Sequence, residues 1–104
     1  MTLKQQCERR LDASGVPYVK VDEAKRALFA LGRGGKLKTF DFIVYRESGP
    51  NLLVMARRNS PAVRKNLQQW SEAFGEGFLP ALAYSHNGAV VFRDLGGNEL
   101  EVQA

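Results

Sequence analysis

Two runs of β-forming residues in the middle of the chain, 37–46 and 52–57, flank the short segment 47–51. This segment contains Gly49 and Pro50, which favour turns, so the sequence predicts a β-hairpin. A hairpin must bury one of its faces against other elements, and that requirement limits the folds open to the chain. Helices or further strands are therefore expected on both sides of it.

The first run of the hairpin has two different faces, because side chains alternate across a strand. One face is expected to carry Phe40, Phe42 and Val44. The other is expected to carry Thr39, Asp41, Ile43 and Tyr45. Asp41 thus stands out as a carboxylate with apolar neighbours along its own face.

Before the hairpin, the pattern predicts a helix over residues 2–13, with Thr2 and Gln5 forming a capping box. Residues 16–21 predict a short or edge strand, and residues 23–31 predict a second helix. The segment 32–36 is a glycine-rich cationic loop without the spacing of a phosphate-binding loop.

After the hairpin, Ser60 and Pro61 are typical of a helix start, and apolar residues at helical spacing, among them Trp70, predict a helix over 61–74. We interpret Trp70 as a core residue rather than a base-stacking platform. The runs 78–84 and 89–93 predict a second hairpin around an Asn-Gly turn, which leaves His86 exposed. Residues 100–102 predict a last short strand or a frayed tail.

The chain has 104 residues and 44% hydrophobic residues, which suits one α/β domain over residues 1–104. No apolar run approaches the ~20 residues that cross a bilayer, and residues 1–10 lack the apolar core of a signal peptide, so no membrane partner and a cytoplasmic location are expected. Cys7 is the only cysteine. It can form neither an intrachain disulfide nor a cysteine zinc cluster, and we expect it to be buried.

The charge is unevenly distributed along the sequence. Residues 1–70 contain 14 Lys and Arg against 6 Asp and Glu, whereas residues 71–104 contain 1 against 5. Such a basic region can bind phosphates, because neutralised phosphates release their counterions. A solvated basic face without a ligand explains the same composition.

The order of predicted elements and several local stretches resemble the PD-(D/E)xK nuclease superfamily, and most closely its HYExAFE family. The stretches that carry the resemblance are 16–19, 21–28, 38–45, 49–54 and 74–78. The resemblance implies a restriction-endonuclease-like fold, an α/β architecture in which helices flank a mixed β-sheet. Because many proteins of that fold pair, it also allows a homodimer.

In these nucleases, an Asp on the first hairpin strand and an acid on the second hold a divalent metal ion, and a lysine two residues later assists the attacking water. By position, Asp41 matches the first acid, whereas Met55 and Arg57 occupy the positions of the second acid and the lysine. Methionine is a poor ligand for magnesium, and arginine does not give up a proton near neutral pH. The HYExAFE motif falls on residues 2–8 and keeps only its last acid, Glu8.

Three functions fit these residues. The leading hypothesis is a degenerate nuclease-like domain, without a cofactor, that binds nucleic acid without cleaving it. Its basic surface would comprise Lys36, Lys38, Arg57, Arg58, Arg64 and Lys65. In the remnant of the catalytic site, formed by Asp41, Glu8 and Arg57, we expect Asp41 to pair with Arg57. The alternatives are a magnesium-dependent endonuclease, with Asp41 and Glu8 as metal ligands, and a protein-interaction module that reuses the fold.

Overall fold

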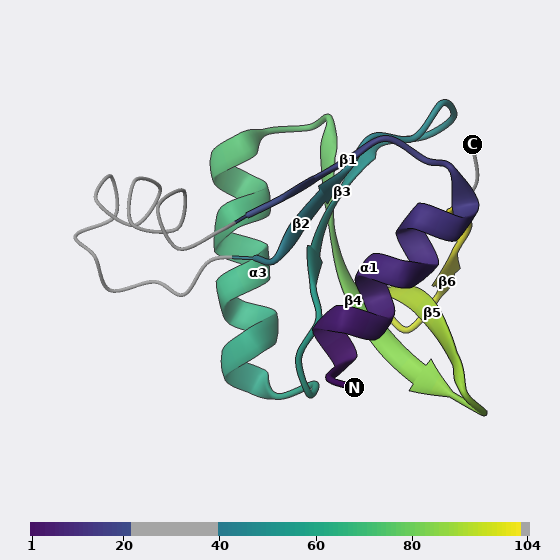
Figure 1. Cartoon of the computed structure of the whole chain (residues 1–104). Coiled ribbons are helices and arrows are strands. Elements are labelled where there is room, and N and C mark those ends of the chain that lie inside the picture. The colour runs from purple at the N-terminus through teal and green to yellow at the C-terminus, as the bar shows by residue number, and fades with distance from the viewer. Residues whose placement is uncertain (22–39, 103–104) are drawn as a thin grey trace.

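The computed structural model describes residues 1–21 and 40–102 (Figure 1). Two helices and six strands make up this part of the chain. The helices are α1 (Leu3–Ser14) and α3 (Pro61–Phe74), and the strands are β1 (Tyr18–Lys20), β2 (Phe42–Val44), β3 (Asn51–Met55), β4 (Phe78–His86), β5 (Ala89–Asp94) and β6 (Glu99–Leu100). The predicted α/β class is confirmed. The helix expected over 23–31, the glycine-rich loop, Lys36 and Lys38 lie outside the described residues.

The six strands form one mixed sheet in the order β1-β2-β3-β4-β5-β6. Neighbouring strands are antiparallel except for β3 and β4, which run parallel in the register that pairs Met55 with Leu82. A parallel pair needs a crossover connection, and α3 provides it. The hairpin predicted around residues 47–51 is confirmed as β2 and β3, and β1 is an edge strand as expected.

The sheet lies between the two helices, so each of its faces carries its own hydrophobic cluster (Figure 1). The cluster on the α1 face includes Cys7, Leu11, Phe42, Val54 and Phe92. The cluster on the α3 face includes Phe40, Ile43, Met55, Leu67 and Trp70. Burial of Cys7 and Trp70 confirms both predictions. None of the helices within the described ranges is long and apolar enough to span a bilayer.

Both helices begin where the sequence predicts. The Thr2 hydroxyl accepts from the Gln5 N–H, and the Gln5 side chain accepts from the Thr2 N–H, which completes the capping box. The Ser60 hydroxyl accepts from the N–H of Val63, and Pro61 opens α3. These bonds satisfy amide groups that would lack a partner within the helix.

The hairpin of β4 and β5 turns through Asn87 and Gly88, which have φ angles of 50° and 80°. Positive φ at both central residues matches the twist of an antiparallel pair and favours an Asn-Gly sequence. The predicted turn is therefore confirmed, although β4 continues to His86. His86 is exposed, as expected.

The alternation expected for residues 39–45 is confirmed from Phe42 to Val44 but is wrong at Phe40, and Thr39 lies outside the described residues. Phe40 and Phe42 are two residues apart, yet Phe40 packs in the α3-side cluster and Phe42 in the α1-side cluster. The regular strand begins only at Phe42, and the Asp41 N–H donates to the Val54 carbonyl oxygen at 2.8 Å although Val54 is already the register partner of Phe42. Asp41 and Phe42 therefore both lie opposite Val54, and the extra residue shifts the alternation of side chains, as in a β-bulge.

Candidate functional site

Asp41 lies in this break and is the only charged or polar residue in the buried core of the described chain, with 1% of its surface exposed. Its carboxylate is directed toward α1. Oδ2 accepts from the Ala56 N–H at 2.9 Å, and Oδ1 lies 3.6 Å from the Lys4 Nζ on α1. A buried carboxylate requires such partners, because removing its charge from water is costly.

The expected pairing of Asp41 with Arg57 is wrong. Across the part of the chain that the structure describes, the cation that pairs with Asp41 is Lys4. The physical reason is the shift in alternation, since the carboxylate points to the α1 side, where the first turn of α1 places Lys4. Arg57 follows β3 after the strand has ended and is partly exposed.

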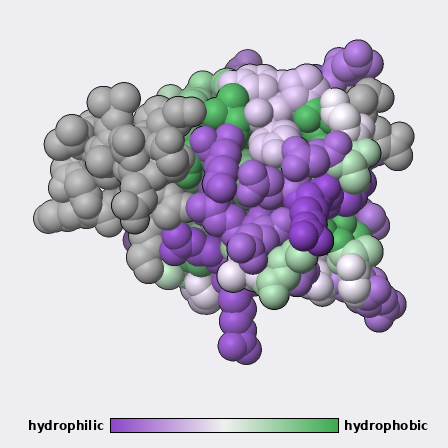
Figure 2. Space-filling view, in the orientation of Figure 1, coloured by the Kyte–Doolittle hydropathy of each residue, from purple (hydrophilic) through white to green (hydrophobic). Residues whose placement is uncertain are grey.

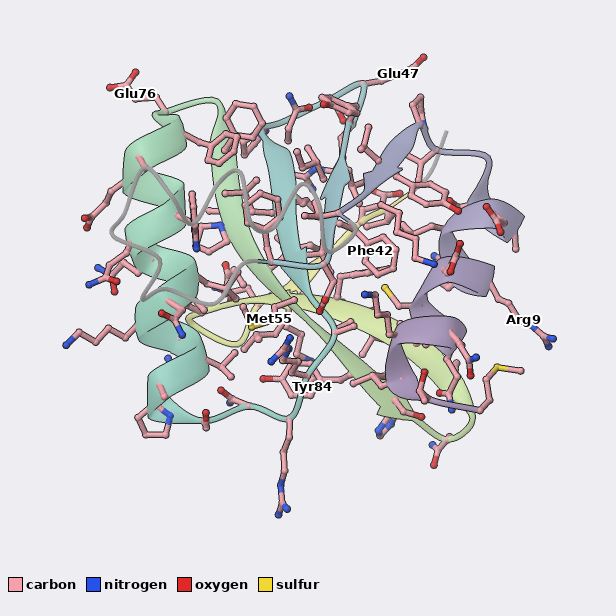
Figure 3. The ribbon with its side chains drawn as sticks, turned by 60° about the vertical axis from the view of Figure 1, so that its left-hand side comes forward. Arg9, Phe42, Glu47, Met55, Glu76 and Tyr84 are labelled. Carbon is pink, nitrogen blue, oxygen red and sulfur yellow. The ribbon has the colours of Figure 1, made fainter. Side chains whose placement is uncertain are left out.

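Leu52 and Val54 of β3 and Ala56, directly after the strand, share the α1 side of the sheet with the Asp41 carboxylate. Met55 packs in the cluster on the other face of the sheet, with 1% of its surface exposed (Figure 3). Val54 and Ala56, whose backbone groups bond to Asp41, both have apolar side chains. By sequence, Met55 occupies the position of the second acid. Its side chain lies on the α3 face of the sheet, opposite to the face toward which the Asp41 carboxylate points.

Glu8 lies on α1, one turn after Lys4, and its Oε2 forms an ion pair with the Nζ of Lys20 at 3.3 Å. Cys7 is close to both acids. Burial raises the pKa of the Cys7 thiol to about 12, and the negative charges of Asp41 and Glu8 act in the same direction. The thiol is therefore neutral at physiological pH and behaves as a core residue. Nowhere in residues 1–21 and 40–102 do three His, Cys, Asp or Glu side chains gather as a metal site would need.

Four of the six cations predicted to form a basic surface are described, namely Arg57, Arg58, Arg64 and Lys65. Arg57 and Arg58 follow the end of β3, and Arg64 and Lys65 lie in the first turns of α3. All four are at least partly exposed. The structure thus brings the two pairs of residues to the same end of the molecule, where β3 leads into α3 (Figure 1).

A surface hollow lies beside the start of α3. Its walls are formed by Asn59, Ser60, Pro61, Arg64, Lys65, Gln68 and Leu95. The guanidinium of Arg64 donates to the carbonyl oxygen of Leu95, which fixes α3 to the loop after β5. In Figure 2, hydrophilic side chains cover much of the visible face, and one projects beyond its lower edge, below the point where the chain enters α3. Arg64 and Lys65 give the lining of the hollow a positive charge.

One contact at this end of the sheet was not predicted from the sequence. The guanidinium carbon of Arg93 on β5 lies over the Tyr84 ring of β4, 5.5 Å from its centroid. The Asn-Gly turn could have indicated this contact, because it fixes the register of β4 and β5. That turn pairs His86 with Ala89, so the register places Tyr84 opposite Val91 and Arg93 opposite Leu82, and the two side chains become diagonal neighbours.

Comparisons with protein-family models, curated proteins and solved structures found no match to this chain.

Proposed function

We propose that this chain is a domain of the restriction-endonuclease-like fold that binds nucleic acid through its basic surface and does not cleave it. The order of the described elements supports the fold: a helix, three antiparallel strands, a helix, and a fourth strand parallel to the third. In the nuclease superfamily that the sequence resembles, the carboxylate corresponding to Asp41 holds the metal ion. The position of Asp41 where β2 begins agrees with that correspondence.

The chemistry around Asp41 supports binding without cleavage. The ammonium group of Lys4 lies where a divalent cation would compete for the same carboxylate, and the neighbouring side chains of Val54 and Ala56 offer no oxygen ligand. Glu8 is itself paired with Lys20. Magnesium prefers several oxygen ligands in octahedral geometry, so this set of residues does not fit it.

The observation that carries the proposal is the cluster of Arg57, Arg58, Arg64 and Lys65 around the start of α3. The first turn of α3 contains no acidic residue, so the partial positive charge of the helix N-terminus adds to these cations. No ion pair joins any of the four to an acid of the described segments. Their charges are therefore available to phosphates, and exposed cations that neutralise phosphates give a salt-dependent affinity.

Titration of a fluorescein-labelled oligonucleotide at increasing salt concentration tests the proposal. The logarithm of the affinity should fall linearly with the logarithm of the salt concentration. Replacing Arg57 or Arg58 with Gln should weaken binding and reduce the slope by about 1 for each phosphate that is no longer neutralised. Arg9→Gln is the matched control, because Arg9 is exposed on the outer side of α1 (Figure 3). Absence of binding at low salt would refute the proposal and favour a protein-interaction module.

Cleavage assays with magnesium or manganese separate binding from catalysis. The parent chain should leave the oligonucleotide intact. Metal-dependent cleavage that disappears in both Asp41→Ala and Glu8→Ala would instead establish the endonuclease alternative. Circular dichroism of each variant is needed beside this assay, because Asp41 is buried and its removal also affects folding.

A further inference from the structure

The pair formed by Arg93 and Tyr84 lies on the α3 face of the sheet. Tyr84 packs against the α3-side cluster, whereas its neighbour in sequence, Ala83, belongs to the α1-side cluster. Both members of the pair are partly exposed. The guanidinium carbon of Arg93 lies 5.5 Å from the centroid of the Tyr84 ring, within the range of a cation–π contact. A guanidinium is planar, so one held beside a ring can stack on a planar ligand.

The pair is close to the basic surface. Met55 of β3 and Leu82 of β4 are register partners, Arg57 follows Met55 by two residues, and Tyr84 follows Leu82 by two residues. Figure 3 places Met55 and Tyr84 toward the end of the sheet at which α3 begins. On the other side of the pair, Leu95 follows Arg93 by two residues and receives the hydrogen bond from Arg64. The Arg93–Tyr84 pair therefore lies between Arg57 and the wall of the hollow.

Glu99 is the β6 residue opposite Arg93, so the local charge is not uniformly positive. No ion pair joins these two side chains in the segments that the structure covers, and Glu99 is exposed. The contact that holds Arg93 is thus with an aromatic ring rather than with a carboxylate. That arrangement leaves the charge of the guanidinium uncompensated.

We propose that the Arg93–Tyr84 pair is a stacking platform for an unpaired base, and that the preferred ligand of the basic surface is single-stranded nucleic acid. This inference rests on the proposed function. In a duplex the faces of the bases are covered by their neighbours, whereas an unpaired base can stack on an arginine plane or an aromatic ring. The cations beside the pair bind the phosphates on either side of that base.

Two single-stranded probes of equal length and charge test the platform. One is an oligodeoxythymidine, and the other carries the same phosphates with abasic sites in place of the bases. The parent chain should bind the first about tenfold more tightly, the effect of losing one stacked base. Arg93→Lys keeps the positive charge but not the plane, so it should bring the ratio of the two affinities close to one. Tyr84→Leu keeps an apolar side chain but removes the ring, and should act in the same direction.

Lys65→Gln is the matched control. It removes a cation that binds phosphate, so it should weaken binding of both probes equally and leave their ratio unchanged. Equal affinity of the parent for the two probes, or an unchanged ratio in Arg93→Lys, would overturn the platform while leaving nucleic-acid binding in place. Binding of neither probe at low salt would instead overturn the proposed function itself. Thermal unfolding of each variant shows whether a lost preference comes from a lost fold.

Discussion

The ion pair between Lys4 and Asp41 joins the first turn of α1 to the beginning of β2, and breaking it should destabilise the fold. At the observed 3.6 Å, two unit charges attract by about 5 kcal/mol for an effective dielectric constant of about 20. The net effect is smaller, because the Lys4 side chain is 33% exposed and its ammonium group is partly screened by water. We expect Lys4→Met, which keeps the stem, to lower the free energy of unfolding by about 1–2 kcal/mol.

Asp41→Ala should cost more than Lys4→Met, because it also leaves the buried N–H of Ala56 without its acceptor. An unsatisfied buried donor adds about 1–3 kcal/mol. The sum, about 2–5 kcal/mol, corresponds to a melting temperature lower by roughly 10–30 °C for a domain of this size. Asp41→Asn retains an acceptor oxygen for Ala56 and should fall between the parent and Asp41→Ala.

Urea unfolding followed by the fluorescence of Trp70, the only tryptophan and a core residue, measures these values. The double-mutant cycle of Lys4→Met and Asp41→Asn isolates the ion pair from the other contacts of Asp41. Lys65→Met is the control, since Lys65 is exposed on α3 and should change stability by less than about 0.5 kcal/mol. A coupling energy below about 0.5 kcal/mol would refute the role assigned to the Lys4–Asp41 pair.

Three further predictions concern Cys7, the start of α3 and the Asn-Gly turn. The pKa of Cys7 is raised from 9.0 to about 12 in the folded chain, so the unfolded thiol ionises first and the free energy of unfolding should fall between pH 9 and 12. The slope attributable to Cys7 approaches about 1.4 kcal/mol per pH unit at most, and Cys7→Ala should remove it in urea titrations across that range. Ser60→Ala should cost about 1 kcal/mol through the lost helix cap, whereas Ser85→Ala, at an exposed strand position, should be neutral in the same assay. Gly88→Ala should cost about 1 kcal/mol, measured as a lower urea midpoint, because φ is 80° although the space around it is open.

The parts of the fold that the sequence predicted correctly depend on local chemistry. Thr2 with Gln5 and Ser60 with Pro61 position the two helices through bonds to residues no more than three positions away. The turn at Asn87 and Gly88 likewise depends on backbone preferences of the two residues themselves. Such signals are complete within a few residues, so sequence alone suffices to recognise them.

The surroundings of Asp41 could not be predicted in the same way. Two of its partners are Lys4 in the first turn of α1, 37 positions earlier, and the backbone amide of Ala56, directly after β3. Which cation reaches the carboxylate depends on the face to which it points, and a single break in alternation reverses that face. The sequence suggests Arg57 because it would lie on the neighbouring strand of the same hairpin, whereas tertiary packing brings Lys4 to the carboxylate.

The break in alternation at Asp41 also determines which positions of the hairpin could share a metal ion with this carboxylate. The resemblance assigns the second acid position to Met55, but an acid at 55 would enter the apolar cluster beneath α3 and lie on the opposite side of the sheet from Asp41. An oxygen ligand that cooperates with Asp41 would have to replace Val54 or Ala56, whose side chains share its face. At those positions it would also have to displace Lys4 from the carboxylate. A metal site at Asp41 would therefore require changes on α1 as well as at Val54 or Ala56, because Lys4 already compensates the buried charge.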